Sequence, residues 1–356
     1  MKPLFKPYVP ELPDLCSILR SGQLAAGDYT VAFEDSLKSY LDEKLVLATN
    51  THANAIKIAL ASLGLRSGDE VIISPMNCLA AVMPFAEAGL KIVWCDIDPD
   101  RGTLNPDSLE ELITGSTKAI VHSHYCGYPG FVDEVKDIAK KYGVLLIDDG
   151  FEGFGSKYKG RIMGKWGSDV TIFSLSAVRL PNAIDGGVLV FRDKSAYRKA
   201  IRLRDLGIDR TLFRDPFGEI DLKCDVAEIG FSGTMSNVNA YVALEQMSQI
   251  DRLISSQRNN AAVLAARLKY IDGIRPIADE TIAPNYWVFG VLSDKKQRDL
   301  QMFRERRLYA SGVHVDISRY SVFERSPELP GVRKFSDSFL ALPCGWWITG
   351  FSEDDI

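Results

Sequence analysis

Short apolar strand patterns alternate with helix patterns from about residue 45 to residue 150, and this alternation limits the fold more than any other feature. It predicts βαβ units and a parallel sheet, with ligands bound beyond the carboxyl ends of the strands. Residues directly after each strand are therefore the candidates for a site. The predicted strands are residues 68–74, 91–98, 118–124, 144–149, 169–175 and 186–191, and the predicted helices are residues 53–63, 79–88, 107–113 and 132–142.

The pattern changes after residue 192. We expect a large domain over residues 1–254 and a smaller α/β domain over residues 255–356. The final residues, 352–356, have the character of a helix start. The elements expected in this part are a helix over 195–206, an irregular stretch over 208–234, a bent or broken helical run over 238–270, a strand over 286–292 and a helix over 296–311.

Composition excludes several classes of protein. The chain has 356 residues and a formal net charge of −5, which argues against a nucleic-acid partner because phosphate contacts need clustered Lys and Arg. No run of 18 apolar residues indicates a membrane span, and the first residues lack the apolar run of a signal peptide. The six cysteines form no CxxC pair and no zinc-like spacing. We therefore expect free thiols in a reducing compartment, the cytoplasm.

Polar residues follow two of the predicted strands. Asp148 and Asp149 precede a Gly-rich turn, where they either cap the turn or aim a carboxylate into a site. Ser174 either donates to a phosphate or satisfies a turn. The loop before residue 53 leads into a helix N-terminus, which suits an anion. Because the chain has neither a GxGxxG nor a GxxxxGK[ST] run, neither a dinucleotide-binding fold nor a P-loop is supported.

The histidines suggest no metal site. From the alternation of side chains along a strand, we expect His122 and His124 to point to opposite faces and not to share a metal ion. Cys126 near His124 has no third orienting group, which favours a structural thiol over a nucleophile. His314 is expected in a strand of the small domain.

Three segments keep a characteristic order and spacing: LASLGLRSGDEVIISP, AEAGLKIVWCDIDPDRGTLNPDSLEELITGSTKAIVHSHYCGYPG and KKYGVLLIDDGFEGFGSKYKGRIMGKWGSDVTIFSLS. Together they resemble the DegT/DnrJ/EryC1/StrS family of sugar aminotransferases, from about residue 30 to 250 and more faintly to the end. The resemblance implies the α/β fold of type I aminotransferases, in which a mostly parallel sheet lies between helices and a smaller C-terminal α/β domain follows. It also implies pyridoxal phosphate, a nucleotide-linked sugar substrate and a homodimer with sites at the subunit interface.

The resemblance carries several cofactor contacts over to this chain. Asp149 falls where the family's Asp pairs with the pyridine nitrogen, which keeps the ring protonated and able to accept electrons. Glu152 stands at the family's Gln near the ring hydroxyl, where it adds negative charge unless it is protonated. Ser174 matches the serine that holds the phosphate, and His124 matches a strand-end histidine.

The resemblance fails at the covalent link to the cofactor. Arg179, in SLSAVRLPNAIDGG, occupies the position of the Schiff-base lysine. A guanidinium stays charged and cannot attack an aldehyde. We expect Arg179 to fill the cofactor space and to pair with Asp149 or Asp185. Three lysines on the loop before the preceding strand have no evident way to reach the ring: Lys157, Lys159 and Lys165.

Further cofactor contacts are altered. His52 and Ala53 replace the Gly and Thr of the family's Ser-Gly-Thr turn, so a hydroxyl is lost and a bulky ring is gained. Cys78 stands where the family has an aromatic residue that stacks on the cofactor, a contact that contributes about 0.5–1.5 kcal/mol beyond its area. Residues 232–235 replace the family's Asn-Tyr-Arg-Met, whose Asn reaches the neighbouring subunit's phosphate.

Three functions remain open. A divergent enzyme would act on a nucleotide-linked sugar in polysaccharide or natural-product biosynthesis without lysine-dependent transamination. If this enzyme binds pyridoxal or pyridoxamine phosphate, it would hold that cofactor non-covalently. It would use no metal. A catalytically inactive relative would bind a ligand or partner only. An active pyridoxal-phosphate-dependent aminotransferase is the third hypothesis, and Arg179 argues against it.

Overall fold

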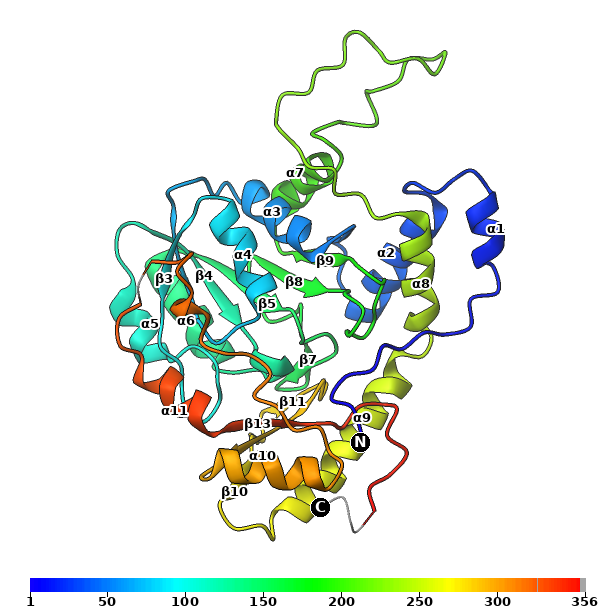
Figure 1. The fold of residues 1–356 in the computed structure, drawn as a ribbon. Coiled ribbons are helices and arrows are strands. Elements are labelled where there is room, and N and C mark those ends of the chain that lie inside the picture. The colour runs from blue at the N-terminus through cyan, green and yellow to red at the C-terminus, as the bar shows by residue number, and fades with distance from the viewer. Residues whose placement is uncertain (325, 353–356) are drawn as a thin grey trace.

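A seven-stranded sheet forms the centre of the computed structural model, which describes residues 1–324 and 326–352 (Figure 1). The strand order is β1-β9-β8-β5-β4-β2-β3, and β9 alone among these strands runs antiparallel to its neighbours. The sheet confirms the predicted mostly parallel α/β fold. Its strands are β1 (Val46–Thr49), β2 (Glu70–Ile73), β3 (Lys91–Trp94), β4 (Thr117–Ser123), β5 (Leu145–Gly150), β8 (Val170–Ser174) and β9 (Gly187–Phe191).

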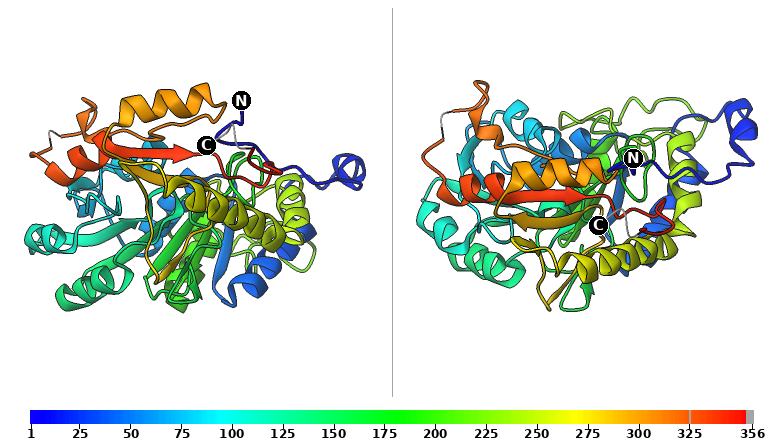
Figure 2. Two further views of the ribbon diagram at one scale, coloured as in Figure 1. Left: turned by 90° about the horizontal axis from the view of Figure 1, so that it is seen from below. Right: turned by 60° about the horizontal axis from the view of Figure 1, so that its bottom comes forward.

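Helices cover both faces of this sheet (Figure 2). Most of its strands are apolar and buried along their whole length, as strands covered on both faces must be. One layer contains α3 (His52–Ser62), α4 (Leu79–Glu87) and α7 (Lys194–Arg204). The opposite layer contains α2 (Asp28–Leu41), α5 (Pro106–Leu112), α6 (Val132–Tyr142) and α8 (Asn237–Met247).

A smaller antiparallel sheet follows in the C-terminal part, in the order β10-β12-β13. Its elements are β10 (Ile274–Pro276), β12 (Phe289–Ser293) and β13 (Phe339–Leu342), packed with α9 (Ile250–Leu268) and α10 (Lys296–Glu305). A third sheet joins β11 (Ile282–Ala283), β6 (Lys157–Tyr158) and β7 (Arg161–Ile162). The remaining helices are α1 (Leu15–Arg20), η1 (Tyr125–Gly127), η2 (Ile317–Arg319) and α11 (Pro330–Ser338).

The C-terminal predictions fare unevenly. The break expected within residues 238–270 is confirmed, since α8 ends at Met247 and α9 begins at Ile250. The helix expected over 296–311 ends at Glu305, because Arg307 adopts a left-handed backbone with φ of 62°. The boundary between residues 254 and 255 stays a prediction and falls inside α9. Of the helix start expected at 352–356, residues 353–356 lie outside the described residues.

An extended arm, residues 208–231, leaves the body after α7 (Figure 1). It has no helix or strand of its own, as we predicted for the irregular stretch over 208–234. Its apolar side chains are strongly exposed, and Phe217, Leu222 and Ile229 are 89%, 99% and 95% exposed.

Two expectations from composition can be compared with the structure. No helix in the described part of the chain is both long and apolar enough to cross a membrane. All six cysteines are described, and all are unpaired.

Candidate functional site

The candidate site lies at the carboxyl ends of β5 and β8, where parallel strands bring Asp149 and Ser174 to one edge of the sheet. Asp149 is buried, and one carboxylate oxygen accepts hydrogen bonds from Ser123 Oγ at 2.9 Å and Asn77 Nδ2 at 3.2 Å. The other accepts from the backbone N–H of Phe151 at 3.1 Å. Burial raises the pKa of Asp149, and these donors partly oppose the shift. Asp149 is thus held in one orientation by three hydrogen bonds.

Glu152 lies in the turn after β5 and connects three parts of the chain. Its Oε1 lies 2.8 Å from His314 Nε2, and its Oε2 accepts from the backbone N–H of Cys126 at 2.9 Å. Arg179 Nη2 lies 3.4 Å from Oε1. Burial by itself raises the pKa of Glu152, but His314, Arg179 and the Cys126 N–H outweigh burial and lower it. Glu152 is therefore the partner of the Arg179 guanidinium and of the His314 ring.

Arg179 is 6% exposed and lies within a stack of aromatic rings. Its guanidinium carbon is 4.4 Å from the ring centroid of Phe151 and 4.1 Å from that of Trp287. Phe5, from the N-terminal segment, stacks on the far side of Trp287 at 4.3 Å. His52 packs edge-on against Phe151 at 4.7 Å. The stack fills the region next to Asp149 with the protein's own side chains.

The predicted partners of Arg179 are wrong, because its ion pair is with Glu152. Asp149 already receives three hydrogen bonds through its two oxygens. Asp185 is exposed and accepts from the backbone N–H of Gly186 at 2.8 Å. Two of the three lysines named above are engaged elsewhere, since Lys159 pairs with Asp133 and Lys165 with Asp42.

The altered phosphate turn surrounds the start of α3. Thr51 caps this helix by accepting a hydrogen bond from the Asn54 N–H, so the helix N-terminus is intact. His52 and Ala53 occupy its first turn, and burial together with the nearby Arg179 lowers the pKa of His52 to about 3. Both ring nitrogens of His52 are closed to solvent and have no hydrogen-bond partner within the described chain.

Two further predicted contacts have local roles. Ser174 Oγ lies 3.3 Å from Ser176 Oγ and is buried. Cys78 caps α4 without a side-chain hydrogen bond, and burial raises the pKa of its thiol. Cys78 supplies no ring to stack on the cofactor, and Ser174 does not replace the hydroxyl lost at Ala53.

The side chains do not fit a covalently held pyridoxal phosphate. Arg179 provides no amine that can become neutral, although burial lowers its pKa. Two of its three nitrogens, Nε and Nη1, are closed to solvent without a partner in the described chain. Phe151, Trp287 and His314 were missed by sequence reasoning. Phe151 lies two residues after Asp149, so its closeness to the site could have been predicted from the sequence. Trp287 and His314 come from segments that are distant in the sequence.

The predictions for His314 and for the paired histidines need correction. His314 lies in a loop rather than a strand, which allows its ring to reach Glu152. His122 and His124 do not point apart, since their ring centroids are 4.3 Å from each other. Residues two apart share a face of a strand, and only adjacent residues alternate.

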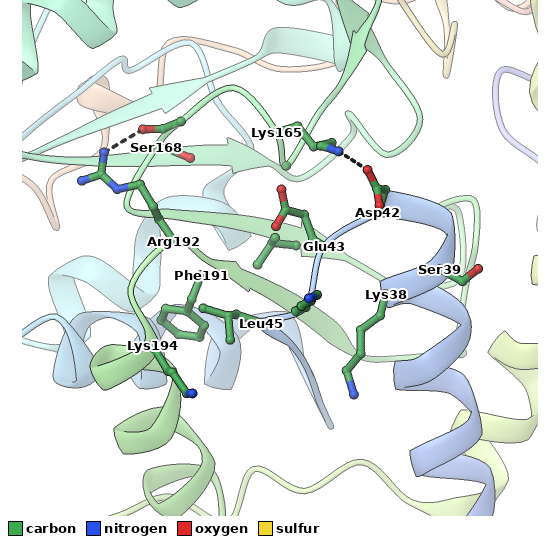
Figure 3. A pocket seen from close by; sticks show the side chains of 14 residues that line it. Lys38, Ser39, Asp42, Glu43, Leu45, Lys165, Ser168, Phe191, Arg192 and Lys194 are labelled. Carbon is green, nitrogen blue, oxygen red and sulfur yellow. Dashed lines mark hydrogen bonds and ion pairs between the residues drawn. The ribbon is translucent and has the colours of Figure 1, made fainter.

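A separate surface cleft of about 920 Å³ lies at the other edge of the sheet (Figure 3). Leu45, before β1, and Phe191, at the end of β9, line it together with Lys38 and Arg192. The cleft contains none of the predicted site residues. Its charges are partly neutralised by their own partners, for example Lys165 by Asp42. We therefore place the candidate site at the Asp149 edge.

Comparisons with known proteins agree on one family. A model of the DegT/DnrJ/EryC1/StrS aminotransferase family matches residues 10–354. GDP-perosamine synthase of Escherichia coli O157:H7 is 26% identical over 267 residues, which cover 75% of this chain and 70% of that protein. A pleiotropic regulatory protein of Geobacillus stearothermophilus is 25% identical over 346 residues, or 95% of this chain and 89% of that one.

Solved structures give the same fold. AtS13 from Actinomadura melliaura superposes with a TM-score of 0.92 at 27% identity, covering 100% of this chain and 96% of that one. The sugar aminotransferase CalS13 from Micromonospora echinospora has a TM-score of 0.91 at 25% identity, with 100% and 97% covered. The type I aminotransferase fold expected from sequence is confirmed.

Proposed function

Because the chain belongs to the DegT/DnrJ/EryC1/StrS aminotransferase family, we propose that it binds a nucleotide-linked sugar and does not carry out lysine-dependent transamination. The observation that carries this proposal is the buried Arg179, paired with Glu152 and enclosed by Phe151 and Trp287. Transamination requires an amine that loses a proton and attacks the cofactor aldehyde. Arg179 is unable to do either, and its surroundings hold it in place.

The ligand class rests on the family and on one relative. A protein similar to this chain is GDP-perosamine synthase, whose name specifies a nucleotide-linked sugar product. The N-terminus of α3, capped by Thr51, keeps free backbone N–H groups suited to an anion such as a diphosphate. The unpaired thiols support a reducing, cytoplasmic location.

A divergent enzyme with a non-covalent cofactor is the second candidate. Its support is the Asp149 network, since Ser123 and Asn77 hold a carboxylate where the family's Asp meets the pyridine nitrogen. Because Glu152 and Trp287 hold Arg179 in the stack, we rank this candidate second.

Calorimetric titration with UDP-, GDP- and dTDP-linked hexoses tests the proposal. We expect at least one of them to bind with micromolar affinity, and no amino sugar to form when pyridoxal phosphate, glutamate and a keto-sugar nucleotide are added. Mass spectrometry of the reaction supplies the second readout. An aminated sugar would contradict the catalytic half of the proposal, and failure of all three nucleotides to bind would contradict the binding half.

The arm supports a homodimer. The arm extends from the body (Figure 1), and its side chains Phe217, Leu222 and Ile229 are strongly exposed, so a second chain must cover them if they are to leave water. Its base lies beside the candidate site, because Ser232 O accepts from Asn50 Nδ2 at 2.9 Å next to the start of α3. A second copy covered by the arm would therefore lie near the site, as the family resemblance implies.

Replacing Phe217, Leu222 and Ile229 together by serine is expected to weaken dimerisation at least about 100-fold, because each buried apolar side chain contributes roughly 1.5–3 kcal/mol. Sedimentation velocity over a concentration series measures the change. Serine at Tyr270, which is 80% exposed outside the arm, serves as the control and should leave dimerisation unchanged. A wild-type monomer, or a variant that dimerises like the wild type, would contradict this role for the arm.

A further inference from the structure

The carboxyl ends of β4 and β5 carry polar residues on both faces of the sheet. In their parallel register His122 is the partner of Asp148, and Ser123 is the partner of Asp149. Because adjacent residues alternate, Ser123 and Asp149 face the candidate site while His122 and Asp148 face the opposite layer. His124 follows the end of β4 and lies with His122 and Asp148. We name His122, His124 and Asp148 the His–Asp cluster.

The cluster is compact and closed. His124 Nε2 lies 3.3 Å from Asp148 Oδ1, and His122 Nδ1 lies 4.0 Å from the same oxygen. One potential ligand atom from each residue lies within 4.8 Å of the other two. The three residues are 0%, 2% and 2% exposed, and Trp166 packs edge-on against the His124 ring at 5.0 Å.

Several polar atoms of the cluster lack partners. Both ring nitrogens of His122, Nδ1 of His124 and Oδ2 of Asp148 are closed to solvent and form no hydrogen bond with the described chain. A buried carboxylate oxygen without a donor is costly, and such atoms in a folded protein call for an ion or an ordered water. The atoms that one ion would share are His124 Nε2 and Asp148 Oδ1, which pair with each other at 3.3 Å and would exchange that contact for the ion.

We propose that the His–Asp cluster binds a divalent transition-metal cation of the zinc type. Two imidazole nitrogens and one carboxylate oxygen are ligands that Zn²⁺ accepts, at bond lengths of about 2.0–2.2 Å. Ligands of a tetrahedral ion at that range lie roughly 3.3–3.6 Å apart, close to the 3.3 and 4.0 Å separations in the cluster. The three ligand atoms lie within 4.8 Å of one another, so the side chains must draw closer together for all three to reach one ion.

The ion would act structurally. Burial of all three side chains excludes substrate from the metal, and a water molecule can occupy a remaining coordination position. The metal would tie the ends of β4 and β5 together directly behind the Ser123–Asp149 pair. It would add a second contact for the Asp148 carboxyl, which among the described residues has His124 as its side-chain partner at hydrogen-bond distance.

The metal content of the full-length protein tests the site. Protein from cells grown with added Zn²⁺ is expected to retain one zinc ion per chain by plasma mass spectrometry. His122→Asn should lose this zinc, whereas the matched control His52→Asn should keep it, since His52 is also buried with unpartnered nitrogens but lies outside the cluster. Refolding of the wild type with Zn²⁺ rather than chelator should raise its melting temperature.

Cobalt provides a readout that does not depend on a variant folding. Wild-type protein refolded with Co²⁺ should show the visible absorption bands of a low-symmetry, nitrogen- and oxygen-bound ion, and Asp148→Asn should abolish them. Folded wild-type protein that takes up neither zinc nor cobalt would overturn the proposal and leave a buried hydrogen bond between His124 and Asp148. Unchanged zinc in His122→Asn would overturn it as well.

Discussion

Replacement of Glu152 by alanine is expected to lower the free energy of unfolding by about 3–5 kcal/mol, because it leaves Arg179 buried without its ionic partner. The variant also removes the acceptor for His314 and for the Cys126 N–H. Urea denaturation at pH 7 measures the change. A loss of this size requires that Arg179 stays inside the aromatic stack.

The exposed pair of Glu110 and Lys141 provides the control. Glu110→Ala should cost less than about 1 kcal/mol, as surface ion pairs do. The double variant Glu152→Gln with Arg179→Met should recover part of the loss, because the uncompensated charge is then absent. If Glu152→Ala is as mild as Glu110→Ala, Arg179 is not confined as described.

His52 is expected to make the protein lose up to roughly 4–5 kcal/mol of stability as the pH falls from 6.5 to 3. Burial and the nearby Arg179 lower its folded-state pKa to about 3, below the ordinary value of 6.5. As the pH falls, the unfolded chain therefore binds a proton on His52 at a higher pH than the folded chain does. The contribution of His52 is complete above pH 6.5 and is lost as the pH falls through that window.

Chemical denaturation of the wild type and His52→Gln at several pH values checks this slope. Both proteins contain the same carboxylates, so the difference between their pH profiles isolates His52. The variant should lose less stability than the wild type between pH 6.5 and 4. Asn54→Ala, in the same turn of α3, should shift stability without changing the slope. Parallel profiles for the wild type and His52→Gln would contradict a buried, neutral imidazole.

Local pattern predicted six of the seven strands of the central sheet and missed β1 (Val46–Thr49). The runs predicted over 68–74, 144–149 and 169–175 are strands, because each is apolar, largely buried and bounded by helix patterns. The same reasoning placed Asp149 and Ser174 at one edge of the sheet. The antiparallel direction of β9 was beyond this reasoning, since strand direction depends on how the connecting segment folds back.

Contacts over long sequence separations were beyond local reasoning. Trp287 stacks on Arg179, and Phe5 stacks on Trp287, from segments more than 100 residues away from Arg179, and neither carries a signal for that role. The choice of Glu152 over Asp149 as the partner of Arg179 depends on donors that already occupy Asp149. The error at His122 and His124 had a different origin, a misapplied rule of alternation rather than missing information.

Borohydride treatment of the purified protein, after incubation with pyridoxal phosphate, tests the absence of a covalent cofactor link most directly. Reduction fixes any carbon–nitrogen link between a lysine and the cofactor, and peptide mass spectrometry then locates it. With Arg179 at the critical position, we predict that no lysine-containing peptide gains the mass of the reduced cofactor. A stoichiometric label on one lysine would contradict the account.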